Sequence, residues 1–294
     1  MKISILQITK DCNQDCFYCT RDRDVKDETI DTIKKKIDGL DNDVKQIIVT
    51  GGEPSLKEDM LDIIRYASRK APVHLQTNGI NFADDNFCRQ VLKAGVSSVL
   101  IALPSFSKET VEKIAQTKDI FEKKIKAVEN LSRYKDIDVG VVFVVNKLNY
   151  REFPDYVKIV SKISRDIYIQ ITYMIRYTKN IEKIRPRAVR LSDFRPYLDK
   201  GLRLCNKYNI QYRIDGIPLC FVQNHLDFVS DIRDYDFVED FIDKKTKKYD
   251  SWNYEGKEHV KPEKCKACKL NHKCKGVYEY YSNIFGTNEL KPVK

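Results

Sequence analysis

The chain has 294 residues and a formal net charge of +10, from 53 Lys and Arg residues against 43 Asp and Glu residues. This length is sufficient for one large α/β domain and a smaller second domain. No apolar run approaches the ~18 residues of a membrane span, and a strand-like segment begins at residue 3 without a signal-peptide pattern, so we expect a cytoplasmic protein without a membrane partner.

The positive charge is compatible with an acidic partner such as RNA. The lysines, however, are scattered among acidic residues on amphipathic helical segments, as in residues 31–38, and no aromatic-basic motif accompanies them. Nucleic-acid binding is therefore not expected. The nine cysteines, in a chain of this length without a signal peptide, indicate a reducing compartment, where clustered thiols bind metal or act in catalysis.

Apolar strand-like segments alternate with segments in which apolar residues recur at helical spacing. The expected strands are residues 3–8, 46–50, 73–77, 98–103, 138–145 and 167–173. The expected helices are residues 30–40, 56–70, 84–94, 108–131 and 153–163. This alternation predicts an α/β fold, a partial (β/α)6 TIM-like barrel whose active face lies at the carboxyl ends of its strands.

Polar or glycine-rich segments follow each expected strand, which agrees with one shared active face. They are residues 12–19, 50–54, 76–79, 104–105, 146–149 and 173–176. Ordinary turn chemistry explains each segment separately but not their joint location.

The first of these segments brings Cys12, Cys16 and Cys19 together within eight consecutive positions. Thiolates are soft ligands for zinc, copper(I) or iron–sulfur clusters. A structural zinc site normally has four ligands, whereas three thiolates on a cubane cluster leave one iron open to a non-protein ligand. A zinc knuckle and a set of free cysteines are the alternatives.

The motif Cys12-x3-Cys16-x2-Cys19, with Tyr18 before the last cysteine, resembles the signature of the radical S-adenosylmethionine (radical SAM) enzymes. The resemblance implies that the three cysteines hold a [4Fe–4S] cluster whose open iron chelates SAM, while Tyr18 packs near the adenine. It also implies electron transfer from a donor such as flavodoxin or ferredoxin, reductive cleavage of SAM to a 5′-deoxyadenosyl radical, and hydrogen abstraction from substrate.

The segment Gly51-Gly52-Glu53-Pro54 resembles the motif of this family that binds the SAM amine. Adjacent glycines permit positive φ and a close approach of the backbone to a ligand, so their carbonyl groups can accept from an ammonium group. Glu53 either adds charge or orders the loop.

Four further residues are expected to contact SAM: Thr77, Asn78, Ser105 and Asn146. Asn78 has the alternative of a left-handed turn residue, and Asn146 that of a strand cap. Relatives carry Ser-Leu-Asp after the fourth strand, where this chain has residues 102–105, Ala-Leu-Pro-Ser, so Ser105 is the expected substitute at the ribose.

After a helix expected at residues 191–208, the composition changes. A strand-like segment at 211–217 is followed by an irregular stretch up to Cys265. We therefore expect a radical SAM partial barrel at residues 1–208 and a second domain at residues 209–294.

Cys265-x2-Cys268-x5-Cys274, with Cys220 upstream, resembles a shortened (SPASM/twitch-like) auxiliary-cluster domain of one branch of the family. The resemblance implies a second [4Fe–4S] cluster, saturated by four thiolates and suited to electron relay. A structural zinc site is the alternative, and His272 is an alternative fourth ligand.

Cys205 lies on the apolar side of the helix at 191–208. A buried core thiol is the first interpretation, and a ligand or hydrogen-atom donor in catalysis is the alternative. Cys88, in the middle of a helix, is expected in the core.

The resemblance implies an enzyme that uses the radical to modify a peptide by cross-linking, epimerisation or oxidation. The second hypothesis is a dehydrogenase or epimerase of a small molecule such as a sugar or nucleoside. It gains weight because many peptide-modifying relatives carry a leader-binding domain before the barrel, whereas here the first strand begins at residue 3. Modification of tRNA depends on charge alone, and a non-catalytic iron–sulfur or zinc protein is a further alternative.

Overall fold

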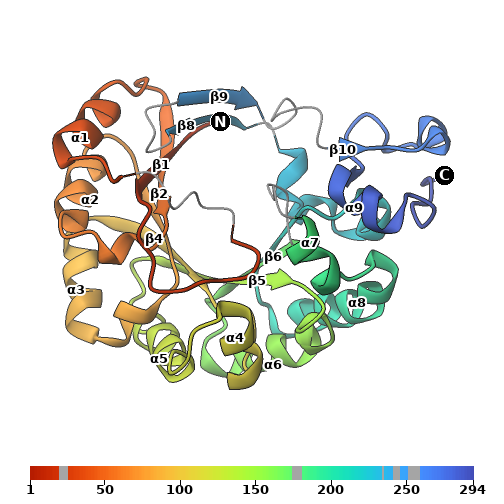
Figure 1. Cartoon of the computed structure of the whole chain (residues 1–294), viewed down its shortest axis with the longest axis horizontal. Coiled ribbons are helices and arrows are strands. Elements are labelled where there is room, and N and C mark those ends of the chain that lie inside the picture. Colours follow the sequence, from red (N-terminus) through yellow and green to blue (C-terminus); the bar gives the residue numbers. More distant parts are fainter. Residues whose placement is uncertain (20–25, 174–180, 234, 241–245, 251–258) are drawn as a thin grey trace. The chain divides into compact units, whose positions relative to one another are not determined.

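The structure is a computed structural model that describes residues 1–19, 26–173, 181–233, 235–240, 246–250 and 259–294 (Figure 1). It divides into two compact units. The first unit contains Met1–Leu103, Ser107–Val141 and Asp234–Asp250, and the second contains Pro104–Phe106, Val142–Arg233 and Ser251–Lys294. Division into domains at residues 208 and 209 stays a prediction, as does the role of residues 174–176, which lie outside the described residues.

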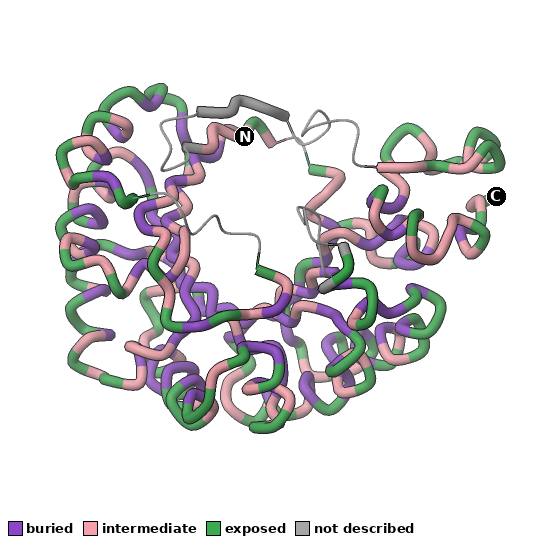
Figure 2. Tube along the Cα trace, in the orientation of Figure 1, coloured by how far each residue is buried: buried purple, intermediate pink, exposed green. Residues whose placement is uncertain are grey.

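The first unit is built on a mostly parallel sheet. Its strands are β1 (Lys2–Thr9), β2 (Val44–Gly51), β3 (Val73–Thr77), β4 (Val96–Ala102), β8 (Asp236–Asp240) and β9 (Thr246–Asp250). Their order is β4-β3-β2-β1-β8-β9, and only the β8–β9 pair is antiparallel. The inner strands are rich in Ile and Val, which is typical of parallel strands covered on both faces, and buried residues follow them in Figure 2.

Helices follow the strands of this unit, as the alternating pattern predicts. They are α1 (Ile30–Asp38), α2 (Met60–Ser68), α3 (Asp85–Lys93), α4 (Lys108–Ala115) and α5 (Phe121–Leu131), with 3-10 segments at Pro54–Leu56 and Ile80–Ala83. Side-chain oxygens of Thr29, Asp84 and Ser107 cap the N-termini of α1, α3 and α4. Such caps accept from backbone N–H groups that have no partner within the helix.

The prediction of a single helix over residues 108–131 is wrong, because two helices, α4 and α5, lie there. Gln116 adopts the left-handed conformation, with φ of 50°, and ends α4. Asp119 also has a positive φ, of 57°, before α5 begins at Phe121. Apolar residues continue at helical spacing through both helices, so the pattern could not reveal a break imposed by the local backbone.

The prediction of irregular structure between Phe221 and Cys265 is also wrong in part. Strands β8 and β9 lie there, and β8 pairs in parallel with β1 from Lys2↔Asp236 to Leu6↔Asp240. The short, charged sequence of β8, Asp-Phe-Val-Glu-Asp, carries little apolar alternation. Its conformation depends on pairing with a strand more than two hundred residues away, which local sequence does not encode.

The second unit combines parallel strands with helices. Its elements are the end of β5 (Asp138–Val145), β6 (Tyr168–Tyr173), β7 (Tyr212–Asp215), α6 (Phe153–Ile163), α7 (Ile181–Ile184) and α8 (Leu191–Tyr208). Strands β6 and β7 pair in parallel, beginning at Ile169↔Tyr212. These elements confirm the expected strands and helices at 138–173 and 191–217.

The C-terminal part of this unit is a small hairpin and helix. Strands β10 (His259–Val260) and β11 (Val277–Tyr278) pair antiparallel, and α9 (Glu279–Phe285) follows. The hydroxyl of Tyr281 on α9 accepts from the N–H of Leu191 at 2.9 Å, which ties this segment to the start of α8. Short 3-10 segments complete the unit at 150–152, 185–187, 219–221, 223–228, 230–232 and 263–267.

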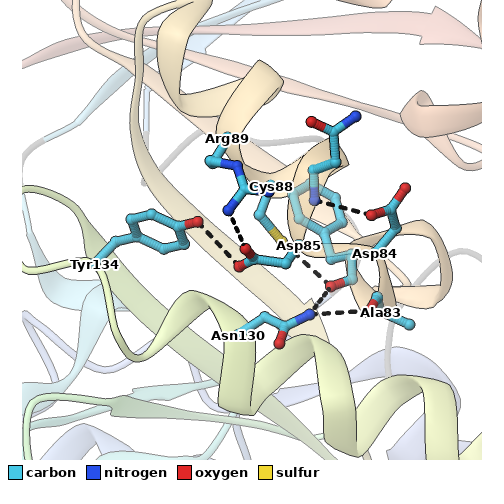
Figure 3. Close-up of polar contacts among 9 residues, drawn as sticks. Ala83, Asp84, Asp85, Cys88, Arg89, Asn130 and Tyr134 are labelled. Carbon is cyan, nitrogen blue, oxygen red and sulfur yellow. Dashed lines mark hydrogen bonds and ion pairs between the residues drawn. The ribbon is translucent and has the colours of Figure 1, made fainter.

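Cys88 is fully buried in the first unit, which confirms the prediction that it lies in the core (Figure 3). Its thiol donates to the carbonyl of Phe82 at 3.2 Å, and the amide of Asn130 on α5 donates to the same carbonyl at 3.0 Å. Burial raises the pKa of Cys88 to about 12. A protonated thiol in such surroundings is a poor nucleophile and a poor ligand.

Within the described residues, no helix is both long enough and apolar enough to cross a membrane.

Candidate active site

The three clustered cysteines follow β1 in the first unit. Cys12 and Cys16 are half-buried and Cys19 is exposed, and all three are free thiols. The N–H of Cys19 donates to the carbonyl of Cys16 at 2.9 Å, so a tight turn joins these two cysteines. Burial raises the pKa of Cys16 to about 11. A positively charged partner would therefore be needed to hold this thiol as a thiolate.

Asp27 fixes the chain where it returns from the cysteine loop. Its carboxylate accepts from the hydroxyl of Thr9 and, at 2.7 Å, from the N–H of Lys10. Both partners lie at the junction of β1 with the loop. Asp27 thus fixes the backbone where β1 passes into the cysteine loop.

The two glycines after β2 are required by close contact with this loop. Gly51 has φ of 138°, and a Cβ atom there would lie 2.3 Å from the carbonyl oxygen of Thr9. A Cβ atom on Gly52 would lie 2.1 Å from the carbonyl oxygen of Asp11. The N–H of Gly52 donates to Thr9 at 2.7 Å. No larger residue fits here without moving the backbone that leads to Cys12.

Glu53 is fully buried and holds the ends of β2 and β3 together. One carboxylate oxygen accepts from the N–H and hydroxyl of Ser55, at 3.0 and 2.6 Å, and from the hydroxyl of Thr77 at 2.7 Å. The other oxygen accepts from the N–H of Asn78. These contacts support loop ordering as the role of Glu53.

Asn78 connects this carboxylate to the cysteine loop. Its side-chain amide donates to Asn13 at 2.7 Å and lies 3.9 Å from the sulfur of Cys12. Its side-chain oxygen accepts from the N–H of Ile80 at 3.0 Å. The left-handed residue of this turn is Gly79, with φ of 87°, so the turn alternative for Asn78 does not apply.

The C-terminus of α4 supports the other side of the cysteine loop. The N–H of Asp15 donates to the carbonyl of Ala115 at 3.0 Å, and that of Phe17 donates to Ile114 at 3.2 Å. The side-chain amide of Gln116 donates back to the carbonyl of Asp15. The last carbonyl groups of a helix have no partner within it, and here the cysteine loop supplies two donors. Sequence patterns did not indicate Gln116 because its contact spans a hundred residues.

Tyr18 is half-buried, and its ring meets that of Phe17 edge to face at 5.2 Å. Burial of the hydroxyl raises the pKa of Tyr18 well above its ordinary value. Contact between this ring and the adenine stays a prediction.

Lys124 is a second residue that sequence reasoning missed. Its side chain lies inside the first unit, 1% exposed, at the start of α5. Its ammonium group donates to the carbonyl groups of Asn78 at 2.6 Å and Ala102 at 2.7 Å. Sequence periodicity placed this position on a helix but could not show that a lysine is buried there.

Ser105 and Asn146 belong to the second unit, and both are fully buried. The hydroxyl of Ser105 donates to the carboxylate of Glu152. The side chain of Asn146 accepts from the N–H of Leu148 at 2.9 Å and donates to the carbonyl of Val144 at 2.9 Å. The geometry of Asn146 favours the strand-cap alternative, and contacts of both residues with SAM stay predictions.

The four C-terminal cysteines line one pocket in the second unit. These residues are Cys220, Cys265, Cys268 and Cys274. Burial raises the pKa values of Cys220 and Cys265, and both thiols interact electrostatically with Cys274. The sulfur of Cys268 also accepts from the N–H of Val293 at 3.2 Å. Across the described residues, no three Cys, His, Asp or Glu side chains lie close enough to hold one metal ion.

His272 is exposed and is not among the residues that line this pocket. Cys205 is fully buried on α8, where burial raises its pKa to about 12. These surroundings favour the core interpretation of Cys205, and its role as a hydrogen donor stays a prediction.

Two solved structures with the same fold contain bound S-adenosylmethionine. Streptococcus suis SuiB bound to S-adenosylmethionine matches with a TM-score of 0.70 and 13% identity, over 95% of this chain and 73% of that one. AnSMEcpe bound to AdoMet and the Kp18Cys peptide matches with a TM-score of 0.69 and 15% identity, over 100% and 93%. They confirm the expected α/β partial-barrel fold.

Curated relatives match at moderate identity. A probable GTP 3',8-cyclase of Methanocaldococcus jannaschii is 27% identical over 232 residues, 74% of this chain and 74% of the relative. Fe-coproporphyrin III synthase of Methanosarcina barkeri is 26% identical over 235 residues, 76% of this chain and 56% of the relative. The chain spans 53% of the probable GTP 3',8-cyclase of Pyrococcus abyssi, to which it is 27% identical.

The family model described as the Radical SAM superfamily matches residues 6–160. That span contains the cysteine loop, the glycine pair, Glu53, Asn78 and Lys124. This family of enzymes uses a [4Fe–4S] cluster together with SAM. The chain belongs to the radical SAM superfamily.

Proposed function

We propose that Cys12, Cys16 and Cys19 hold the [4Fe–4S] cluster of a radical SAM enzyme that abstracts hydrogen from a small-molecule substrate. When bound, the cluster and SAM supply a 5′-deoxyadenosyl radical. The observation that carries this proposal is the support of the cysteine loop from two sides, by the ends of β2 and β3 and by the C-terminus of α4. These contacts fix the backbone of the loop that carries the three thiols.

In this proposal, the chain holds SAM beside the same loop. The carbonyl groups of Gly51 and Gly52 accept from its ammonium group, Tyr18 packs on the adenine, and Glu53 with Thr77 keeps the loop in place. Asn78 orients Cys12 and Asn13 through its side-chain amide. A flavodoxin or ferredoxin is the proposed electron donor, and nucleic acid is not a proposed partner.

A small molecule is the better-supported substrate class. The curated relatives that cover about three quarters of this chain are named for GTP and for Fe-coproporphyrin III. We infer a substrate of that size, with the reaction itself open between cyclisation, dehydrogenation and epimerisation.

A peptide substrate is the second candidate. It is supported by AnSMEcpe, which was solved with a peptide and which this chain matches over its full length. At 15% identity, that match supports a shared fold but not a shared substrate. A peptide substrate therefore ranks second.

We also propose that the C-terminal cysteines, residues 220, 265, 268 and 274, hold an auxiliary [4Fe–4S] cluster. The four thiols line one pocket, and Cys220 and Cys265 both interact electrostatically with Cys274. Four thiolates saturate a [4Fe–4S] cluster, and they are also a common closed shell for zinc. Structural zinc remains the alternative.

The test is anaerobic reconstitution followed by iron and zinc analysis, electron paramagnetic resonance of the reduced protein, and measurement of 5′-deoxyadenosine. A signal that SAM perturbs, with 5′-deoxyadenosine formed, is expected. Nucleotides and tetrapyrroles should increase this product more than peptides do. A fully iron-loaded protein that neither changes its signal with SAM nor forms 5′-deoxyadenosine would refute the proposal.

A further inference from the structure

A buried positive charge is connected to the cysteine loop through Asn78. Lys124 extends from α5 to the carboxyl ends of two strands, where its ammonium group donates to Asn78 after β3 and to Ala102 at the end of β4. A buried ammonium group loses the solvation of water, so such a lysine is retained only where hydrogen bonds or opposite charges stabilise it. Two neutral carbonyl groups satisfy its hydrogen bonds but do not neutralise its charge.

The charged groups around Lys124 belong to the proposed site. Cys16 and Glu53 are the two titratable groups that act electrostatically on Lys124. Burial lowers the pKa of Lys124 to about 8, which leaves it mainly protonated at neutral pH. Its positive charge therefore acts toward the thiolate side of the site.

Lys124 also reaches the ligand loop through one intervening residue. Asn78 accepts from Lys124 through its backbone carbonyl and donates to Asn13 through its side chain, 3.9 Å from the sulfur of Cys12. The same residue donates its N–H to Glu53. One short path thus links the ammonium group, the carboxylate and the first cysteine.

We propose that Lys124 is a positioning residue whose buried charge balances the thiolate-bound cluster and favours its reduced state. This inference rests on the proposed function, because it takes Cys12, Cys16 and Cys19 as cluster ligands. Reduction by the external donor adds one electron to the cluster and breaks no bond, so the site gains one negative charge. A fixed positive charge nearby stabilises that product more than the oxidised state.

The test compares two neutral substitutions that differ in hydrogen bonding. Lys124→Gln keeps a donor for a backbone carbonyl, whereas Lys124→Met keeps none. The midpoint potential of the SAM-free cluster is measured by redox titration in anaerobically reconstituted protein. Both variants are expected to lower the ratio of reduced to oxidised cluster at a fixed potential at least tenfold, a shift of ~59 mV for one electron.

Two controls separate charge from structure. Lys124→Arg retains the charge and should keep a potential close to that of the unaltered protein. Lys158→Met removes an exposed lysine that pairs with Asp155 at 2.8 Å in the second unit, and it should cause no shift. A normal potential in both iron-loaded neutral variants would overturn the inference, as would a shift in the Met variant alone, which indicates a hydrogen-bonding role.

If neither neutral variant folds, Glu53→Gln provides the test with the opposite sign. It removes the negative charge that faces Lys124, so the potential should rise, and an unchanged potential would contradict the inference. The unaltered protein distinguishes failure of this inference from failure of the proposed function. If the proposed function is wrong, the unaltered protein will show no iron signal that SAM perturbs.

Discussion

At the scale of single residues, the site depends on a few buried polar contacts that hold its loops. Glu53 accepts four hydrogen bonds, and Thr77 both donates to it and accepts from the N–H of Gly79 at 3.0 Å. Leaving a buried carboxylate without one donor costs more free energy than the bond contributes when formed, because the group has already lost its water.

Thr77→Val should therefore lower the free energy of unfolding by about 1–3 kcal/mol, since the valine keeps the shape but not the hydroxyl. Urea unfolding of the apoprotein measures this. Thr50→Val is the matched control: its hydroxyl donates to the neutral amide of Gln76 at 3.2 Å in a half-buried position, so its cost should be smaller. Equal costs would contradict the special role of the Glu53 contact.

The cysteines differ in their surroundings, and a substitution series follows from that difference. Cys16→Ala should abolish iron binding at the first site and 5′-deoxyadenosine formation. Cys205→Ala and Cys88→Ala should keep their full iron content, because both thiols are fully buried in the core. The thiol of Cys88 also donates to the carbonyl of Phe82. Retention of product formation by Cys16→Ala would remove the basis for the ligand assignment.

Sequence motifs predicted the thiols and glycines but not the residues that support them. Cys12, Cys16 and Cys19 are close in sequence, so spacing alone brings them together. Gln116 and Lys124 reach the site only through the fold. The sequence pattern places both on amphipathic helical segments, where a polar residue is usually solvated.

At the scale of elements, the short helix α4 supports the cysteine loop, because its last carbonyl groups accept hydrogen bonds from N–H groups of that loop. Gln116→Gly should relieve the left-handed backbone conformation while removing the bond to Asp15. We expect iron release to a chelator to become about fivefold faster, equivalent to the loss of about 1 kcal/mol. Asn209→Gly is the control, because Asn209 also ends a helix with φ of 58° but belongs to the second unit. Equally fast release from both variants would argue against this support.

Strand β8 shows what local sequence leaves undetermined among the elements. The expected βα units were found because each strand carries its own apolar run, whereas β8 is charged and takes its conformation from β1 on one side and β9 on the other. Val238→Pro should therefore remove one ladder hydrogen bond, distort β8 and increase amide exchange along β1 at least about tenfold. Val238→Thr keeps the N–H and the β-branched shape, so exchange in that variant should remain close to normal. Unchanged exchange in the proline variant would mean that β8 does not protect β1.

At the scale of the whole molecule, the open question is how many redox centres the chain carries. The C-terminal thiols of the second unit line a common pocket, and four thiolates suit either an iron–sulfur cluster or a zinc ion. With two [4Fe–4S] clusters, the reconstituted protein should contain about eight irons per chain. Cys268→Ala should reduce this to about four and impair substrate turnover while leaving SAM cleavage intact, because the first site lies in the other unit. His272→Ala, in the same loop but exposed, should keep the full count. About four irons with one zinc in the unaltered protein would make the C-terminal site structural, and the electron-relay role would then be wrong while the radical chemistry of the first site stands.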